Sequence, residues 1–287
     1  MITYHRIDSD NYLYFDNLLP MLYKKRFATE TDIQGLGASV EGSACGIILY
    51  REESELGILR ILYIAVSKPF QGQGIATELL LTLSDAAYNS TGLPAVADFF
   101  AHNEDDAPYR LFKSSGMFSV REEDGHRVVL SHSDMTDFLK KNKETVAKIP
   151  DIKSISLGDM DREKKNILFD FYSKKAPLGD FFDGELDSGL TNAVFSKGNI
   201  ELAVFVTRSL SPLGYYISYL YSGSGGTDVL RIISRTMLLI YSRMKKTDSL
   251  VFETLTDSVD MLFLHLFGDD HISERRFMAG YNGPYAI

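Results

Sequence analysis

A glycine-bearing loop between an apolar strand and an amphipathic helix has the most distinctive chemistry in this chain. The strand is expected to end at Val66, the loop covers residues 71–76, and a helix with an apolar stripe follows. Such a loop leaves backbone N–H groups free at the start of the helix. These donors and the positive end of the helix dipole bind phosphate. The loop therefore predicts a site for a phosphorylated cofactor.

Two familiar glycine loops do not fit these residues. The dinucleotide fingerprint needs a glycine directly after the strand, but residues 67–71 separate the strand from Gly72, and Thr77 stands where a third small residue is required. The phosphate loop of nucleotide hydrolases needs Gly-Lys-Ser/Thr, which is absent. The pattern that fits is Gln/Arg-x-x-Gly-x-Gly/Ala, which is filled by Gln71, Gly74 and Ala76.

This loop resembles the pyrophosphate loop of the GNAT family of acyl-CoA N-acyltransferases. A second block supports the resemblance. A predicted strand over residues 93–101 is followed by Asn103 and by a helix that begins near Ala107 and leads to Gly116 and Phe118, close to the family pattern. The similarity covers roughly residues 30–130.

The resemblance implies acetyl-CoA as the acyl donor. In the family, main-chain groups of the strand before the loop pair with the pantetheine arm, and the loop N–H groups hold the pyrophosphate. Asn103 would contact the cofactor near the pantetheine or the leaving sulfur. The predicted cofactor-binding residues are Ile64, Ala65, Val66, Gln71, Gly72, Gln73, Gly74, Ile75, Ala76, Thr77 and Asn103.

The catalytic acid departs from the family pattern. Acyl transfer from a thioester to an amine needs removal of the amine proton, a polarised carbonyl and protonation of the leaving thiolate. Family members commonly have a tyrosine four residues before Gly116 as the acid, but this chain has Phe112, which has no proton to donate. Tyr109 shares a helix face with Phe112 and is the candidate acid.

Asp98 is the candidate general base. It alternates on one strand face with Val96, Phe100 and His102. An acid among apolar side chains has a raised pKa and can accept a proton, whereas an exposed sheet face is the equal alternative. His102 has a suitable pKa but, as a lone histidine, is more often structural. The glutamates within residues 52–55 favour a solvated turn, and a water chain can also remove the proton.

Composition limits the class of protein. A chain of 287 residues with 45% apolar content supports one large or two ordinary domains. The absence of a long apolar run and of a signal-peptide hydrophobic region favours a cytoplasmic location without a membrane span. A net charge of −9 disfavours a nucleic-acid surface and suits an amine substrate. The single cysteine, Cys45, excludes an internal disulfide, and the histidine spacing predicts no metal site.

The predicted elements repeat in two halves. A strand followed by a helix opens each half, over residues 2–19 and 152–175, and Pro150 closes a lysine-rich segment between them. The predicted fold is α/β (α+β), with two GNAT-like domains at residues 1–140 and 150–287. Each domain is expected to be a mixed, mostly antiparallel twisted sheet flanked by helices.

The second half repeats the strand, glycine turn and helix in weaker form. Its glycine turn, residues 223–227, follows a strand over residues 215–221, but no Gln or Arg precedes the glycines. The second domain is therefore predicted to be degenerate, and the turn to be a flexible connection rather than a cofactor site.

Three functions follow from these patterns. The first is an N-acetyltransferase that moves an acetyl group from acetyl-CoA to a primary amine by direct attack in a ternary complex. The second is a CoA-binding regulatory protein without turnover, because Phe112 replaces the usual acid. The third is a structural protein. The expected partner is a small-molecule or peptide amine, with no nucleic acid and no membrane, and the oligomeric state is not predicted.

Overall fold

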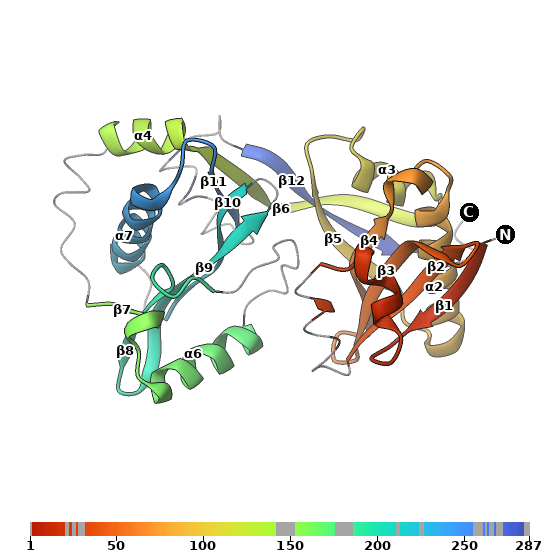
Figure 1. Ribbon diagram of the computed structural model, residues 1–287, viewed down its shortest axis with the longest axis horizontal. Coiled ribbons are helices and arrows are strands. Elements are labelled where there is room, and N and C mark those ends of the chain that lie inside the picture. The colour runs from red at the N-terminus through yellow and green to blue at the C-terminus, as the bar shows by residue number, and fades with distance from the viewer. Residues whose placement is uncertain are drawn as a thin grey trace. The chain divides into compact units, whose positions relative to one another are not determined.

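The computed structural model describes residues 2–20, 23–24, 27, 32–141, 153–175, 186–210, 213–223, 227–254, 261, 263, 267 and 272–283 (Figure 1). The chain divides into two compact units. Unit 1 comprises Met1–His126 and Glu274–Ile287, and unit 2 comprises Arg127–Ser273.

Unit 1 is a mixed sheet with helices on both faces. In chain order its elements are β1 (Ile2–Ile7), the 3₁₀ helix η1 (Tyr12–Leu18), β2 (Ile33–Val40), β3 (Ser43–Glu53), β4 (Ile58–Val66), η2 (Lys68–Phe70), α2 (Ile75–Thr91), β5 (Ala95–Ala101), α3 (Ala107–Ser114), β6 (Phe118–Ser131) and β12 (Ile272–Tyr281).

The strands of unit 1 are ordered β1-β2-β3-β4-β5-β12-β6. Strands β1 to β4 pair antiparallel in sequence order, β5 runs parallel to β4, and β12 pairs antiparallel with β5. The last strand of the chain thus completes the sheet of the first unit. The predicted domains, residues 1–140 and 150–287, follow the two sequence repeats and remain a prediction. The compact units are divided differently, since residues 274–287 belong to the first unit.

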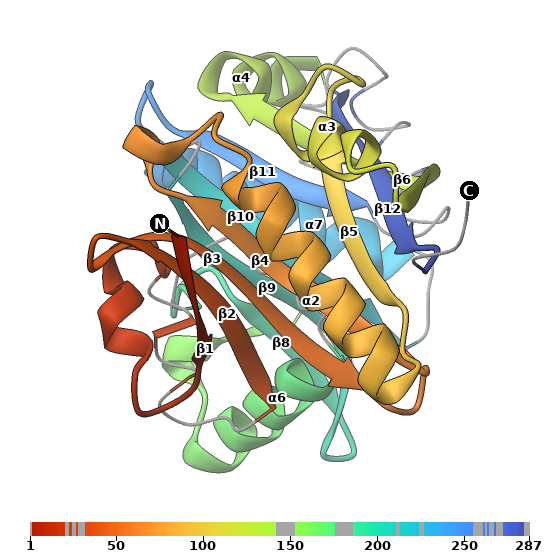
Figure 2. The same cartoon turned by 90° about the vertical axis from the view of Figure 1, so that its right-hand side faces the viewer.

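Two apolar clusters cover the two faces of this sheet. Leu79 of α2, Ile48 and the aromatic residues of β5 and α3 belong to one cluster. Phe15 of η1 packs with Ile47 and Leu49 in the other. Because neighbouring residues in the middle of β3 enter opposite clusters, the strand is apolar on both faces over residues 44–50. Figure 2 shows α2 lying over β3 and β4.

The elements of unit 2 are α4 (His132–Lys141), β7 (Ile155–Ser156), η3 (Leu157–Asp159), α6 (Arg162–Lys175), β8 (Asn192–Ser196), β9 (Asn199–Leu210), β10 (Leu213–Ser222), α7 (Thr227–Arg243) and β11 (Ser249–Thr254). From β7 to β11, unit 2 repeats the order strand, helix, three strands, helix and strand that unit 1 has from β1 to β5. The part of β6 from Arg127 onward belongs to unit 2. The strand order of this unit is β6-β11-β10-β9-β8-β7, with β10 and β11 parallel. One apolar cluster contains α4 and α7, and another contains α6.

Two predicted features fall outside the described residues. They are the middle of the glycine turn, residues 224–226, and the lysine-rich segment after Lys141. Within the described part of the chain, no helix is long and apolar enough to cross a membrane.

In each unit, the first of the two parallel strands has a β-bulge. These strands are β4 in unit 1 and β10 in unit 2. Leu62 is the extra residue of β4, and Ser218 is the extra residue of β10. A tyrosine hydroxyl bonds to each bulge. Tyr23 donates to the main-chain oxygen of Leu62 at 3.3 Å, and Tyr172 donates to Oγ of Ser218 at 2.9 Å. The bulges show that the sequence repeat is also a repeat of backbone geometry.

Candidate functional site

Strands β4 and β5 separate after a short parallel contact. The ladder joins residues 59–60 to residues 95–96, and no later pair joins the two strands, both of which the structure describes in full. β4 continues beside β3 as far as Val66, while β5 pairs with β12 as far as Ala101. Beyond residue 60, no described strand therefore pairs with β4 on its β5 side, and we call this unpaired edge of β4 the β4–β5 opening.

The bonding of β4 to β3 decides which main-chain groups face the opening. The N–H of Ser67 donates to the oxygen of Cys45 at 2.9 Å. Because hydrogen-bonded and non-hydrogen-bonded pairs alternate in an antiparallel ladder, the N–H and C=O of Val66 point away from β3. By the same alternation, the N–H and C=O of Ile64 also point into the opening, whereas those of Ala65 point toward β3. Two of the three predicted strand residues thus face the opening with their main chain.

A glycine loop connects the end of β4 to α2. Gly72 and Gly74 have φ values of +75° and +82°, a left-handed conformation that glycine adopts without the strain of a Cβ. The amide of Gln71 donates to the main-chain oxygen of Val66 at 2.9 Å, and the amide of Gln73 donates to the main chain of η2 at 3.1 Å. The two glutamines therefore shape the loop through their side chains.

The start of α2 presents a row of main-chain donors. The first bond within the helix runs from the N–H of Glu78 to the oxygen of Gly74 at 2.9 Å. The N–H groups of residues 74–77 precede this bond and have no acceptor among the residues that the structure describes. Loop residues 71–74 are exposed. Free N–H groups and the helix dipole together make this end of α2 suitable for an anion.

Tyr109 and Phe112 lie in an aromatic cluster on the α2 face of the sheet. The ring of Phe112 stacks on Phe99 with centroids 5.1 Å apart, and Tyr109 meets Phe277 edge to face at 5.1 Å. Burial raises the pKa of Tyr109, and the neighbouring carboxylate of Glu104 raises it further. The hydroxyl of Tyr109 therefore keeps its proton at neutral pH, while Phe112 is a core residue.

Asp98 lies on the other face of the sheet, in a set of ion pairs. Nη1 of Arg60 donates to one carboxylate oxygen at 2.6 Å, and Nη2 of Arg276 donates to the other at 2.8 Å. Arg60 also donates through Nε to Glu53 at 2.8 Å. The carboxylate of Asp98 is thus paired, neither among apolar groups nor fully exposed. Both carboxylate oxygens of Asp98 therefore already accept charged hydrogen bonds.

Asn103 begins the connection between β5 and α3. Its Oδ1 accepts from the N–H of Asp105 at 2.8 Å, an Asx turn. The carboxylate of Asp106 accepts from the N–H of His102 at 2.6 Å. The carbonyl of the Asn103 side chain is therefore used locally. Its NH₂ group has no partner in the described part of the chain and remains available to a ligand.

Comparison with known proteins identifies the family of the first part of the chain. Residues 2–117 match the model of the acetyltransferase (GNAT) family. This part of the chain is a GNAT domain. No curated protein matches the chain.

Solved structures extend the GNAT fold to the second unit. A tandem GNAT protein from the clavulanic acid biosynthesis pathway has a TM-score of 0.66 at 10% identity, with 99% of each chain covered. The glucosamine N-acetyltransferase region of a fungal multi-domain GH3 β-N-acetylglucosaminidase has a TM-score of 0.54 at 11% identity, covering 98% of this chain and 38% of that one. At these identities the similarity is one of fold, and it confirms the predicted tandem GNAT architecture.

Sequence reasoning did not find Gly46, which positions the GNAT loop. A Cβ at this residue of β3 would lie 2.8 Å from Cγ2 of Ile75 and 3.0 Å from Cδ1 of Leu79. Glycine therefore lets the first turn of α2 approach the sheet closely. A glycine inside an apolar strand was the available signal.

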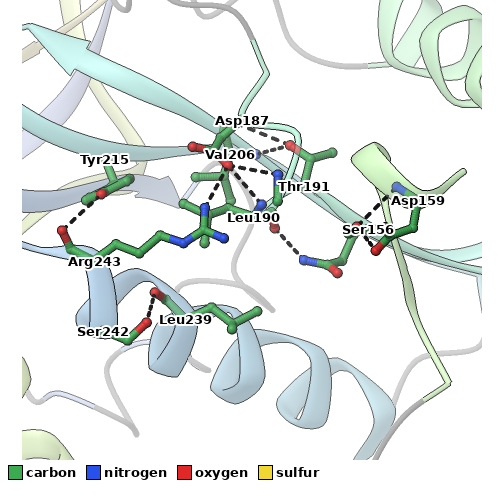
Figure 3. Close-up of polar contacts among 12 residues, drawn as sticks. Ser156, Asp159, Asp187, Leu190, Thr191, Val206, Tyr215, Leu239, Ser242 and Arg243 are labelled. Carbon is green, nitrogen blue, oxygen red and sulfur yellow. Dashed lines mark hydrogen bonds and ion pairs between the residues drawn. The ribbon is translucent and has the colours of Figure 1, made fainter.

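In the second GNAT-like unit, one group of polar contacts joins a turn to the end of α7. Figure 3 shows Asp187, whose Oδ1 accepts from the N–H groups of Gly189 and Leu190 at 2.9 and 3.0 Å and from Nη1 of Arg243 at 3.3 Å. Tyr215 donates to the main-chain oxygen of Arg243 at 3.3 Å. These contacts fix a turn against the end of α7. In the described residues no cluster of His, Cys, Asp or Glu suits a metal ion.

Proposed function

We propose that this protein is an N-acetyltransferase that moves an acetyl group from acetyl-CoA to a primary amine by direct attack in a ternary complex. The observation that supports this most is that two groups of main-chain hydrogen-bond donors follow each other along one stretch of the chain. The main chain of Ile64 and Val66 faces the β4–β5 opening, and the N–H groups of residues 74–77 lie just beyond it. The match of residues 2–117 to an acetyltransferase family supports the same function.

The geometry fits the parts of acetyl-CoA. With a rise of about 3.3 Å per residue, the N–H groups of Ile64 and Val66 lie about 6.6 Å apart, on an unpaired strand edge to which an extended, amide-bearing pantetheine arm can add. The start of α2 suits the pyrophosphate. Acetyl-CoA, when bound, supplies an activated acyl group as a thioester.

We assign the remaining chemical steps to groups of this chain and to water. A main-chain N–H at the β4–β5 opening polarises the thioester carbonyl. Tyr109, whose raised pKa keeps the hydroxyl protonated, donates to the leaving thiolate. The NH₂ group of Asn103 contacts the donor near the sulfur. Because both oxygens of Asp98 are engaged, we assign removal of the amine proton to water rather than to this residue.

A matched pair of glycine variants tests the cofactor site. Gly74 and Gly92 stand at opposite ends of α2, both have positive φ, and a Cβ at either would meet nothing within 4 Å. Replacement by valine introduces the same left-handed strain, about 1–2 kcal/mol. We expect Gly74→Val to abolish acetyl-CoA binding in calorimetry and Gly92→Val to preserve it. No binding by the unaltered protein at millimolar acetyl-CoA would refute the proposal.

A second candidate function is a CoA-binding protein without turnover. The observation that favours it is the position of Phe112, whose ring fills the aromatic core where the family commonly has its acid. Release of free thiol from acetyl-CoA, measured across a panel of primary amines, separates the two. Binding without thiol release from any amine would support this alternative. A cytoplasmic location and an amine of small-molecule or peptide type remain predictions.

A further inference from the structure

The β4–β5 opening begins at a carboxylate held by two guanidinium groups. Arg60 is the last residue of β4 that pairs with β5, and its partner is Val96. Asp98 lies two residues further along β5, and it accepts from Arg60 at 2.6 Å and from Arg276 of β12 at 2.8 Å. We call these three residues the Asp98 clamp. It joins β4, β5 and β12 where the ladder between β4 and β5 ends.

Unit 2 has the same arrangement with different side chains. Tyr216 of β10 pairs with Val251 of β11, and Glu253 lies two residues beyond Val251. The hydroxyl of Tyr216 donates to one oxygen of Glu253 at 3.1 Å. Arg127 of β6 donates to the other oxygen through Nε at 3.1 Å and Nη2 at 2.8 Å. We call these three residues the Glu253 clamp.

The two clamps occupy matching places in the repeat. Arg60 precedes the bulge residue Leu62 by two positions, and Tyr216 precedes the bulge residue Ser218 by two positions. In each unit the second donor is an arginine from the strand on the far side of the acid. The recurrence with different residue types indicates that the carboxylate position, rather than one particular ion pair, belongs to the architecture.

The clamps differ in exposure and in the length of the ladder beside them. The side chains of Arg60, Asp98 and Arg276 are 24–29% exposed. Those of Arg127 and Glu253 are 15% and 5% exposed. The parallel ladder of unit 2 continues over four residue pairs, whereas that of unit 1 has two. In unit 1 the two parallel strands therefore separate after fewer residue pairs than in unit 2, and the clamp at that point is partly exposed to solvent.

We propose that Arg60, Asp98 and Arg276 are positioning residues, which fix the point where β4 and β5 separate and thereby hold the main chain of Ile64 and Val66 in place for the acyl donor. Charge-assisted hydrogen bonds between partly buried groups resist separation better than exposed ion pairs. The identity of the ligand rests on the proposed function, whereas the effect of the clamp on the edge of β4 does not.

The test uses the full chain with Asp98→Asn, Arg60→Met and the double variant. We expect amide hydrogen exchange over residues 61–66 to rise about 10-fold in each single variant, because a loosened edge opens more often. We expect the Kd of acetyl-CoA and its KM to rise about 10-fold with kcat within about 2-fold. The double variant should show about the same 10-fold effect, not about 100-fold, because both changes break one unit.

Tyr216→Phe is the matched control, since it removes the equivalent bond of the Glu253 clamp. It should leave exchange over residues 61–66 and the affinity for acetyl-CoA unchanged. If Asp98→Asn does not fold, Arg276→Met removes one donor and takes its place. Arg60→Lys, which keeps the charge, should restore part of the affinity.

Two results would overturn the positioning role. One is unchanged exchange over residues 61–66 in the clamp variants, and the other is a change no larger than that of Tyr216→Phe. If the unaltered protein binds no acetyl-CoA, the proposed function fails, and the exchange measurement still decides the role of the clamp.

Discussion

Gly46→Ala should disturb the start of α2 through one added methyl group. The new Cβ would lie 2.8 Å from Cγ2 of Ile75 and 3.0 Å from Cδ1 of Leu79. The favourable separation of two carbon atoms is about 3.5–4.0 Å, so the helix has to move by up to about 1 Å. Ile75 is 1% exposed, and an isoleucine in a helix has one strongly preferred χ1, so its side chain does not rotate away.

The magnitude follows from the cost of overpacking. One extra methyl in a packed core costs about 1–3 kcal/mol. At about 2–4 °C per kcal/mol for units of this size, we expect Tm to fall by roughly 2–12 °C. A displacement of about 1 Å also weakens hydrogen bonds from the N–H groups at the start of α2, and a loss of about 1.4 kcal/mol of binding free energy corresponds to a rise of about 10-fold in the Kd of acetyl-CoA.

Thermal unfolding and calorimetric titration measure both effects. Gly280→Ala is the control, because this glycine is also in a strand of unit 1 and a Cβ there would meet nothing within 4 Å. We expect the control to match the unaltered protein. Equal Tm and equal affinity in the two variants would show that Gly46 does not hold the start of α2.

Two further predictions concern protons. Tyr109→Phe should lower kcat about 100-fold with little change in the KM of acetyl-CoA, because the hydroxyl acts on the leaving thiolate; steady-state kinetics that show an unchanged kcat would remove Tyr109 from the mechanism. Burial alone would raise the pKa of Glu53, but hydrogen bonds and charge from Arg51 and Arg60 outweigh it, and the pKa is lowered from its ordinary value of 4.5. A lowered pKa in the folded state stabilises the protein above that value, and this contribution is lost as the pH falls. The Tm difference between the unaltered protein and Glu53→Gln should therefore be largest near neutral pH and shrink below about pH 4.5; a constant difference would contradict the assignment.

Local sequence patterns predicted the elements of the site. They could not predict contacts between segments that are far apart in the sequence. The strand, the loop at residues 71–76 and the helix after it were predictable, because each depends on neighbouring residues. The tandem GNAT fold was predictable from the family resemblance of the first half and from the repeated order of elements in the second half. Alternation gave the sheet face of Asp98 but not its partners, because Arg276 is 178 residues away in the chain. The closeness of Gly46 to α2 likewise depends on packing between two elements, which no single stretch of sequence shows.

The pairing of β12 with β5 has a consequence for the order in which the protein is completed during synthesis. Phe277, Ala279 and Tyr281 fill the core of unit 1, yet about 150 residues of unit 2 leave the ribosome before them. At a translation rate of about 5–20 residues per second, the first unit remains without its last strand for roughly 7–30 s. During that time the edge of β5 is an exposed template for pairing with other chains. The domain that is translated first is therefore finished last, and a nascent chain needs protection until its final strand arrives.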